Sequence, residues 1–84
     1  MKRRKKLTER EVMNRLLKGE TLALVDRDGI AQSLQVLRPD GMMQVLWRDS
    51  FGKWGTRWGR GGSSASWREL NEEEREVAKK ARRR

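Results

Sequence analysis

A base, a tryptophan and a glycine follow one another twice within ten residues of this sequence, as Lys53-Trp54-Gly55 and Arg57-Trp58-Gly59. The flat face of an indole stacks on nucleobases, and a neighbouring ammonium or guanidinium group pairs with phosphate. Glycine lets a ligand approach the backbone closely. The side chains that such chemistry would use are Arg48, Lys53, Trp54, Arg57, Trp58 and Arg60. The two tryptophans could instead close a small hydrophobic core, and the sequence leaves both interpretations open.

Catalytic chemistry has few residues to work with, because the chain contains no cysteine, histidine or tyrosine. It therefore lacks the commonest general base, the commonest metal ligand, and any disulfide or thiolate metal site. Asp, Glu, Lys, Arg and Ser remain, and no spacing among them indicates a catalytic carboxylate pair. We predict a binding protein that is not an enzyme and that uses neither a metal nor a cofactor.

The net charge of +9 resides in the two ends of the chain. Between residues 11 and 78, ten bases and eleven acids nearly cancel. Basic tails bind phosphate polymers by displacing counterions, although some serve simply as solvated ends that keep a protein in solution. The tail cations that we assign to electrostatic contact are Lys2, Arg3, Arg4, Lys5, Lys6, Lys79, Lys80, Arg82, Arg83 and Arg84.

The sequence also indicates where in the cell the protein is located and how large its core can be. The longest apolar run, Leu22–Val25, is far shorter than the ~20 residues of a membrane-spanning helix. The basic residues 2–6 are not followed by the apolar stretch of a signal peptide. We therefore expect a soluble cytoplasmic protein without membrane contact. Eighty-four residues allow one domain with a small core, which makes a homo-oligomer attractive.

Local patterns predict how the elements that carry these residues are ordered. Thr8 and Glu11 have the spacing of a capping box, and Gly19 marks a stop, so we expect a helix at residues 9–18. Strands are expected at residues 21–25, 30–38 and 42–48, joined by tight turns at Asp28-Gly29 and Pro39–Gly41.

The third predicted strand places Met43, Val45 and Trp47 on one face, and we therefore expect Trp47 in the core. Glycines favour an extended segment around Trp54 and Trp58, followed by a flexible loop at residues 59–64.

A last helix is expected from about residue 69 to residue 82, with Trp67 packed into the core beside its start. Two capping boxes compete for that start, one formed by Ser66 and Glu69 and the other by Asn71 and Glu74. Acids in the first half of the helix and bases in the second complement the helix dipole.

These elements predict an α+β domain, in which an N-terminal helix packs on a three- to four-stranded antiparallel meander and a C-terminal helix follows. A small SH3-like or Sm-like barrel is the variant of this fold that we also consider. The expected boundaries are a basic disordered tail at residues 1–6, the domain at residues 7–70, and a charged helix with a basic end at residues 71–84.

Three stretches are similar to small phage proteins of the Thoeris anti-defence type, namely residues 7–24, 46–50 and 64–69. In that family a short helix feeds a strand, a later strand ends in Trp, and a further Trp lies beside acids. The resemblance implies capture of a cyclic ADP-ribose-type signal by an oligomer. The Arg-x-Gly-Trp segment of the family is absent, with Ala23-Leu24-Val25-Asp26 in its place, so no individual ligand residue is transferred.

Residues 24–30 and 34–46 resemble the first strands of the Sm-like RNA-binding fold, a helix followed by a strongly bent five-stranded sheet. The glycines that bend the second strand of that family are missing here, since residues 30–38 contain none.

Taken together, these features favour a small, non-enzymatic, phage-like protein that contacts nucleic acid, DNA or RNA, through its tails and the Trp/Arg/Gly segment. The alternative is a counter-defence protein that inhibits a host protein or sequesters a small, cyclic nucleotide. A third hypothesis is an assembly protein whose tails neutralise phosphate. A phage protein of any of these kinds would act in the bacterial cytoplasm.

Overall fold

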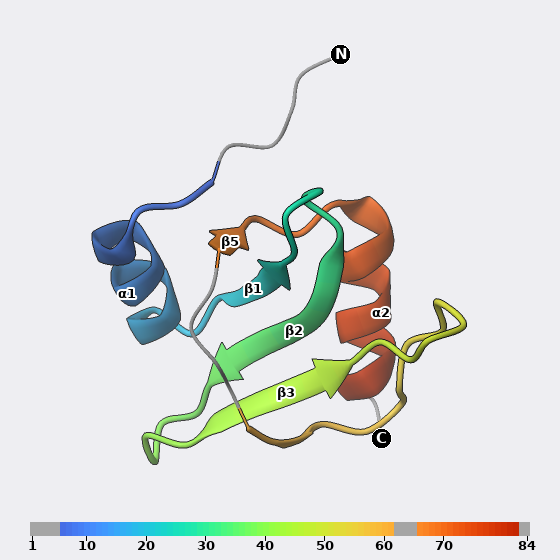
Figure 1. Cartoon of the computed structure of the whole chain (residues 1–84). Helices are drawn as coiled ribbons and strands as arrows, with labels where there is room; N and C mark the ends of the chain where they lie inside the picture. Colours follow the sequence, from blue (N-terminus) through green and yellow to red (C-terminus); the bar gives the residue numbers. More distant parts are fainter. Residues whose placement is uncertain (1–5, 62–65, 83–84) are drawn as a thin grey trace.

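The computed structural model describes residues 6–61 and 66–82. Its helices and strands are α1 (Glu9–Leu17), β1 (Thr21–Val25), β2 (Ala31–Leu37), β3 (Met43–Trp47), β4 (Gly59–Arg60), β5 (Ser66–Arg68) and α2 (Glu72–Arg82). The five strands form an antiparallel sheet in the order β4-β3-β2-β1-β5 (Figure 1). The predicted α+β fold, an antiparallel sheet with a helix before and after it, is confirmed.

The first helix begins at the capping box expected from the sequence. The Thr8 hydroxyl accepts a hydrogen bond from the Glu11 amide at 3.2 Å, and the Glu11 carboxylate accepts one from the Thr8 amide at 3.1 Å. Val12 and Leu16, one turn apart, are buried and pack on Leu22 of β1. The spacing of apolar residues in α1 therefore fixes which of its faces meets the sheet.

The second helix covers the opposite face of the sheet. Ala78 and Ala81 of α2 belong to a buried cluster with Ala23 of β1 and Leu46 of β3. Adjacent residues of a strand point to opposite faces, so Leu22 lies under α1 while Ala23 lies under α2. The sheet consequently lies between the two helices (Figure 1).

The predicted capping box at Ser66 and Glu69 is wrong, because residues 66–68 form β5. Trp67 pairs with Leu24 of β1, and the strand adds to the sheet beside β1. The sheet thus has five strands where we expected a meander of three or four. The competing box at the start of α2, formed by Asn71 and Glu74, is the one present.

Another short segment continues the sheet beyond β5. Lys6 forms a bridge with Arg68, and the Leu7 amide donates to the Trp67 carbonyl at 2.9 Å. Leu7 and Trp67 then pack together against the cluster under α1. The basic N-terminal tail is therefore attached at one edge of the sheet through Lys6.

A buried ion pair joins α2 to the sheet. The Arg68 guanidinium donates to both oxygens of Glu74, at 2.7 and 2.8 Å. The Arg68 Nε atom also donates to the Gly29 carbonyl in the β1–β2 turn at 3.2 Å. The Glu74 carboxylate accepts from the Asn71 amide at 2.9 Å, and the Asn71 side chain accepts from the Glu74 amide at 2.8 Å. One carboxylate thus completes both an ion pair and a helix cap.

The expectation that Trp47 lies in the core is wrong, since it is 50% exposed. The alternation itself holds, because Val45 on the same face is fully buried. The nine-residue α1 spans only about 13 Å and contacts mainly β1 and β2. It reaches Met43 at the start of β3. Trp47 lies four residues further along the strand, roughly 13 Å away, and extends past the helix.

Some predicted features fall partly or wholly outside the described residues. The loop expected at residues 59–64 begins as β4, and residues 62–65 lie outside the described part of the chain. The tail residues Lys2, Arg3, Arg4, Lys5, Arg83 and Arg84 also lie outside it. Lys6, Lys79 and Lys80 are exposed, while Arg82 is described only as the last residue of α2.

We predict that Glu74→Gln lowers the free energy of unfolding by about 3 kcal/mol, because it leaves the buried Arg68 guanidinium without a counter-charge. Glu73→Gln, an exposed position in the same helix turn, is the matched control and should change it by less than about 0.5 kcal/mol. Urea unfolding followed by tryptophan fluorescence measures both.

A double variant, Arg68→Met with Glu74→Leu, should be more stable than Glu74→Gln, since an apolar pair of similar volume often replaces a buried ion pair without loss. Equal unfolding midpoints for Glu74→Gln and Glu73→Gln would contradict the stabilising role of the Arg68–Glu74 ion pair.

Candidate nucleic-acid interface

A small hairpin at residues 48–54 leads away from the end of β3. The Asp49 carboxylate accepts from the Phe51 amide at 2.9 Å and from the Lys53 amide at 2.8 Å. The Asp49 amide donates to the Lys53 carbonyl at 2.8 Å. Arg48 and Trp54 form an antiparallel β-bridge at the base of the hairpin. Gly52 has φ +82°, a conformation that side chains other than glycine rarely adopt. The carboxylate of Asp49 therefore holds the hairpin closed from inside.

Phe51 lies at the tip of this hairpin and is 90% exposed. A side chain at the tip of a tight turn has no opposing strand against which to pack. Lys53, which follows directly, is exposed as well. The hairpin thus presents an aromatic ring and an ammonium group to solvent.

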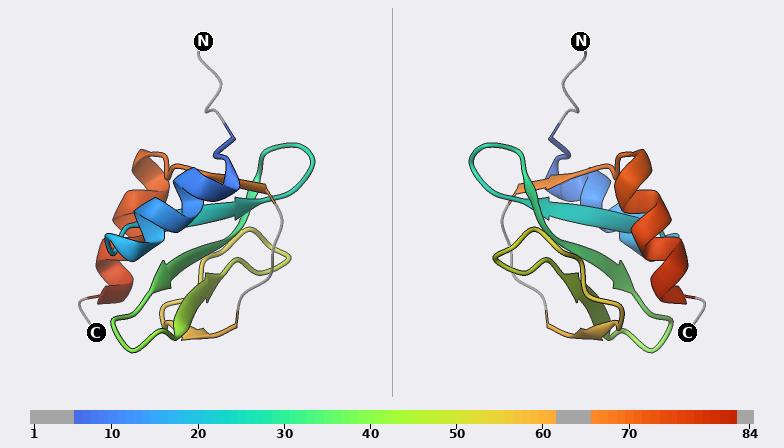
Figure 2. Two further views of the ribbon diagram at one scale, coloured as in Figure 1. Left: turned by 90° about the vertical axis from the view of Figure 1, so that its left-hand side faces the viewer. Right: turned by 90° about the vertical axis from the view of Figure 1, so that its right-hand side faces the viewer.

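The chain then returns along β3. The Gly55 amide donates to the Trp47 carbonyl at 2.9 Å, and β4 pairs Gly59 with Val45 and Arg60 with Gln44. Within the described residues, β4 is the outermost strand on this side of the sheet (Figure 2). The hydrogen bond from Gly55 to Trp47 and the pairing of β4 with β3 therefore hold residues 47–60 along one edge of the sheet.

Trp54 and Trp58 are both partly buried and pack against the core cluster under α2. The Arg48 guanidinium lies 6.0 Å from the centre of the Trp54 ring, and it donates to the Ala31 carbonyl at 3.4 Å. The Trp58 indole nitrogen is buried and has no hydrogen-bond partner among the described residues. Of the two interpretations left open by the sequence, the geometry supports core closure for both indoles.

The ring of Trp47 is placed differently. Its edge lies over Gly61, where a built Cβ atom would come within 3.6 Å of the indole and 3.8 Å of the Val45 side chain. In register with Ser33 on β2, Trp47 is on the α1 side of the sheet, opposite to Trp54 and Trp58. Half of the residue remains open to solvent.

The cations of this region are not neutralised by neighbouring acids. Residues 44–61 contain four bases and a single acid, Asp49, whose carboxylate is engaged inside the hairpin. None of these four bases forms an ion pair within the described residues. Lys53, Arg57 and Arg60 are exposed, whereas Arg48 is half-buried. We call the exposed side chains of this border the β3–β4 edge: Trp47, Phe51, Lys53, Arg57 and Arg60. Because Arg60 pairs with Gln44, its side chain is on the face of the sheet opposite to Trp47.

The predicted site residues thus divide into two groups, those that pack on the core and those that face solvent. Arg48 and Trp54 pair across the hairpin, and Trp58 joins Trp54 on the core. Lys53 and Arg57 face solvent, as an extended segment predicts. Sequence reasoning missed Phe51 and misplaced Trp47. The Asp49-Ser50-Phe51-Gly52 turn carried a signal for Phe51, because an Asp two residues before and a Gly directly after mark a turn tip.

No group of three or more His, Cys, Asp or Glu side chains in residues 6–61 and 66–82 could hold a metal ion. Neither helix in that part of the chain is long and apolar enough to cross a membrane.

We predict that Trp58→Ala lowers the free energy of unfolding by about 2–4 kcal/mol, toward the range for aromatic residues removed from cores. Phe51→Ala should change it by less than about 0.5 kcal/mol, because the ring contacts little. Chemical unfolding of the two variants side by side measures the difference. Similar losses for both would show that the division into core and exposed aromatics is incorrect.

No protein-family model, curated protein or solved structure matches this chain. Its function is therefore argued from its own residues and their geometry.

Proposed function

We propose that the protein binds single-stranded nucleic acid along the β3–β4 edge and that the basic tails add electrostatic attraction. The observation that carries this proposal is the exposure of Trp47 and Phe51, at 50% and 90%, in a segment whose four bases outnumber its single acid and form no ion pair within the described residues. The exposed rings leave apolar area in water that a stacked nucleobase would cover, and the solvated cations remain accessible to phosphate.

The chemistry of the β3–β4 edge fits an unpaired strand better than a duplex. Bases in single strands are free to stack on aromatic side chains, whereas duplex bases stack on one another. Guanidinium and ammonium groups at Arg57, Arg60 and Lys53 supply contacts to phosphate. Stacking and phosphate contact of this kind depend little on base sequence, so we expect weak sequence preference.

Attachment of the tails is consistent with a cooperating role. Lys6, the first described residue, pairs with Arg68 at the edge of the sheet opposite to β4. Lys79 and Lys80 are exposed in the last turns of α2. A bound strand would meet these bases in addition to the β3–β4 edge only if it were long enough to pass around the sheet.

Trp47→Ala and Phe51→Ala should each weaken binding of a fluorescent single-stranded oligonucleotide about tenfold, since base–aromatic stacking contributes roughly 1–3 kcal/mol. Met13→Ala is the matched control, because Met13 is 56% exposed on the outer face of α1. Fluorescence anisotropy at fixed salt gives the dissociation constants. Unchanged affinity in both aromatic variants would refute the β3–β4 edge as the contact surface.

The contribution of the tails is measured by salt dependence. Deleting residues 1–5 and 83–84 removes six bases and leaves every described helix and strand intact. The slope of log affinity against log salt should become shallower by about 0.7 for each phosphate that the tails no longer neutralise. An unchanged slope would exclude the tails from binding, while the Trp47 and Phe51 variants would still test the β3–β4 edge.

A further inference from the structure

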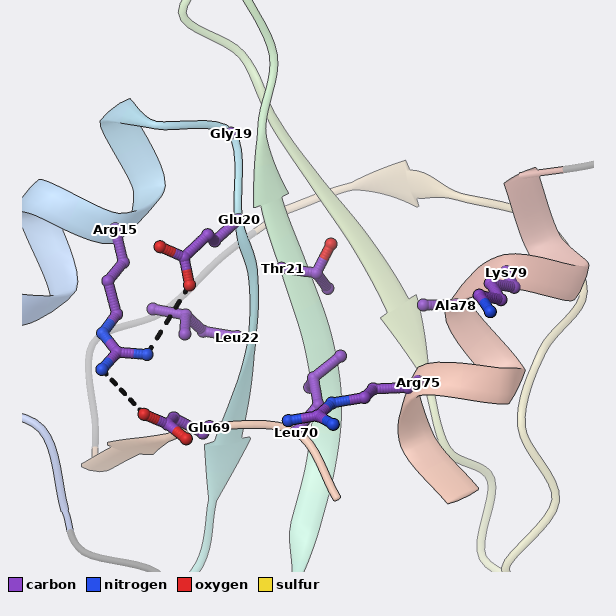
Figure 3. A pocket seen from close by; sticks show the side chains of 10 residues that line it. All are labelled: Arg15, Gly19, Glu20, Thr21, Leu22, Glu69, Leu70, Arg75, Ala78 and Lys79. Carbon is purple, nitrogen blue, oxygen red and sulfur yellow. Dashed lines mark ion pairs between the residues drawn. The ribbon is translucent and has the colours of Figure 1, made fainter. Parts of the chain in front are cut away.

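A pocket of about 330 Å³ lies at the other side of the sheet, between the end of α1, the start of β1 and α2 (Figure 3). It exists because β5 is short. β5 pairs only with Ala23–Val25, so no described strand covers the edge of β1 at residues 21 and 22. The volume is at the lower end of the range for small-molecule sites.

The floor of the pocket is apolar, and one of its walls is basic. Leu22, Leu70 and Ala78 form the floor and are buried. Arg75 and Lys79 form the wall contributed by α2. They are one helical turn apart, and like charges at this spacing repel one another by about 0.2–0.5 kcal/mol. Neither cation forms an ion pair among the described residues, although Glu72 and Glu76 lie three residues before Arg75 and Lys79 on the same helix.

The opposite wall is acidic. The Arg15 guanidinium holds Glu69 at 2.7 Å and Glu20 at 3.6 Å, and both carboxylates line the pocket with it. Figure 3 shows this triad facing the side of the pocket from which Arg75 enters. Each carboxylate is more than 40% exposed and retains free acceptor capacity. The two carboxylates outnumber the single guanidinium of Arg15, so this wall favours a ligand group that donates hydrogen bonds.

We infer that this pocket binds a small phosphorylated molecule that also carries an amino group. A phosphate monoester bears nearly two negative charges at neutral pH, which matches two neighbouring cations better than a carboxylate does. The amino group would face Glu20 and Glu69, and the body of the molecule would cover Leu22, Leu70 and Ala78. This site is separate from the β3–β4 edge and does not rest on the function proposed above.

Four probes separate the parts of this inference: adenosine monophosphate, inosine monophosphate, adenosine and inorganic phosphate. Adenosine monophosphate should bind to the full chain in calorimetric titration. Adenosine, which lacks the phosphate, should bind at least tenfold more weakly. Inosine monophosphate carries a carbonyl where adenosine has its amine, and it should also bind about tenfold more weakly. Equal affinity for inorganic phosphate and adenosine monophosphate would overturn the role of the acidic wall.

Variants assign binding to the pocket. Arg75→Gln and Lys79→Gln should each reduce affinity for adenosine monophosphate about tenfold, since each removes one charge-assisted hydrogen bond. Lys80→Gln removes the same charge from the next residue of α2, which does not line the pocket, and should have no effect. Glutamine keeps the helix propensity of these exposed positions. Equal effects of Lys79→Gln and Lys80→Gln would overturn the inference.

A last pair of measurements distinguishes the two sites. The variants Trp47→Ala and Phe51→Ala should leave adenosine monophosphate affinity unchanged. Loss of mononucleotide binding in those variants, with none in Arg75→Gln, would place the small molecule at the β3–β4 edge and contradict the pocket. Absence of any adenosine monophosphate binding would contradict it as well.

Discussion

The bidentate ion pair between Arg68 and Glu74 is the contact on which the arrangement of this small domain depends. Both side chains are buried, and they join β5, the β1–β2 turn and the first turn of α2. Two buried charges are expensive to desolvate, and only close geometry with further hydrogen bonds offsets that cost. The cap that Asn71 and Glu74 exchange supplies such bonds. A chain without cysteine thus fixes its last helix with polar groups.

The position of α2 decides what the tryptophans can do. Once α2 is held on one face of the sheet, Trp54 and Trp58 pack against the cluster between α2 and the sheet and are partly buried. On the other face, α1 is too short to reach the end of β3, and Trp47 stays half exposed. The aromatic surface open to a partner is therefore a consequence of helix length and position. It consists of Trp47 and Phe51, and the bases around them come from the same segment.

Much of the fold follows from local sequence signals. The cap at Thr8, the turns at Asp28-Gly29 and Pro39–Gly41, and the alternation in β1 to β3 each depend on residues close in the chain. Every one of these elements is present within two residues of the predicted bounds. The strand β5 is different, because its three residues have no periodicity and pair with β1 some forty positions earlier. Only a non-local contact defines it.

The sequence was sufficient to predict which segment carries the candidate site, but not which of its side chains are exposed. Residue types placed bases, glycines and tryptophans at residues 48–60, yet which indoles face solvent depends on α1 and α2. The burial of Ser33 and Gln35 was likewise not predictable from residue type. Both side chains are fully buried, and they pair with Trp47 and Val45 of β3. The Gln35 amide donates to the Ser33 hydroxyl at 3.2 Å. The burial of these two polar side chains depends on the elements packed over β2, which the alternation of residues along the strand does not reveal.

Photocrosslinking of the full chain to a single-stranded oligonucleotide, with the attached peptides located by mass spectrometry, tests the central claim most directly. We expect crosslinks at Trp47 and Phe51, and none at Trp54 and Trp58, which pack against the core cluster. Crosslinks confined to the basic tails, or located at Trp54 and Trp58, would contradict it.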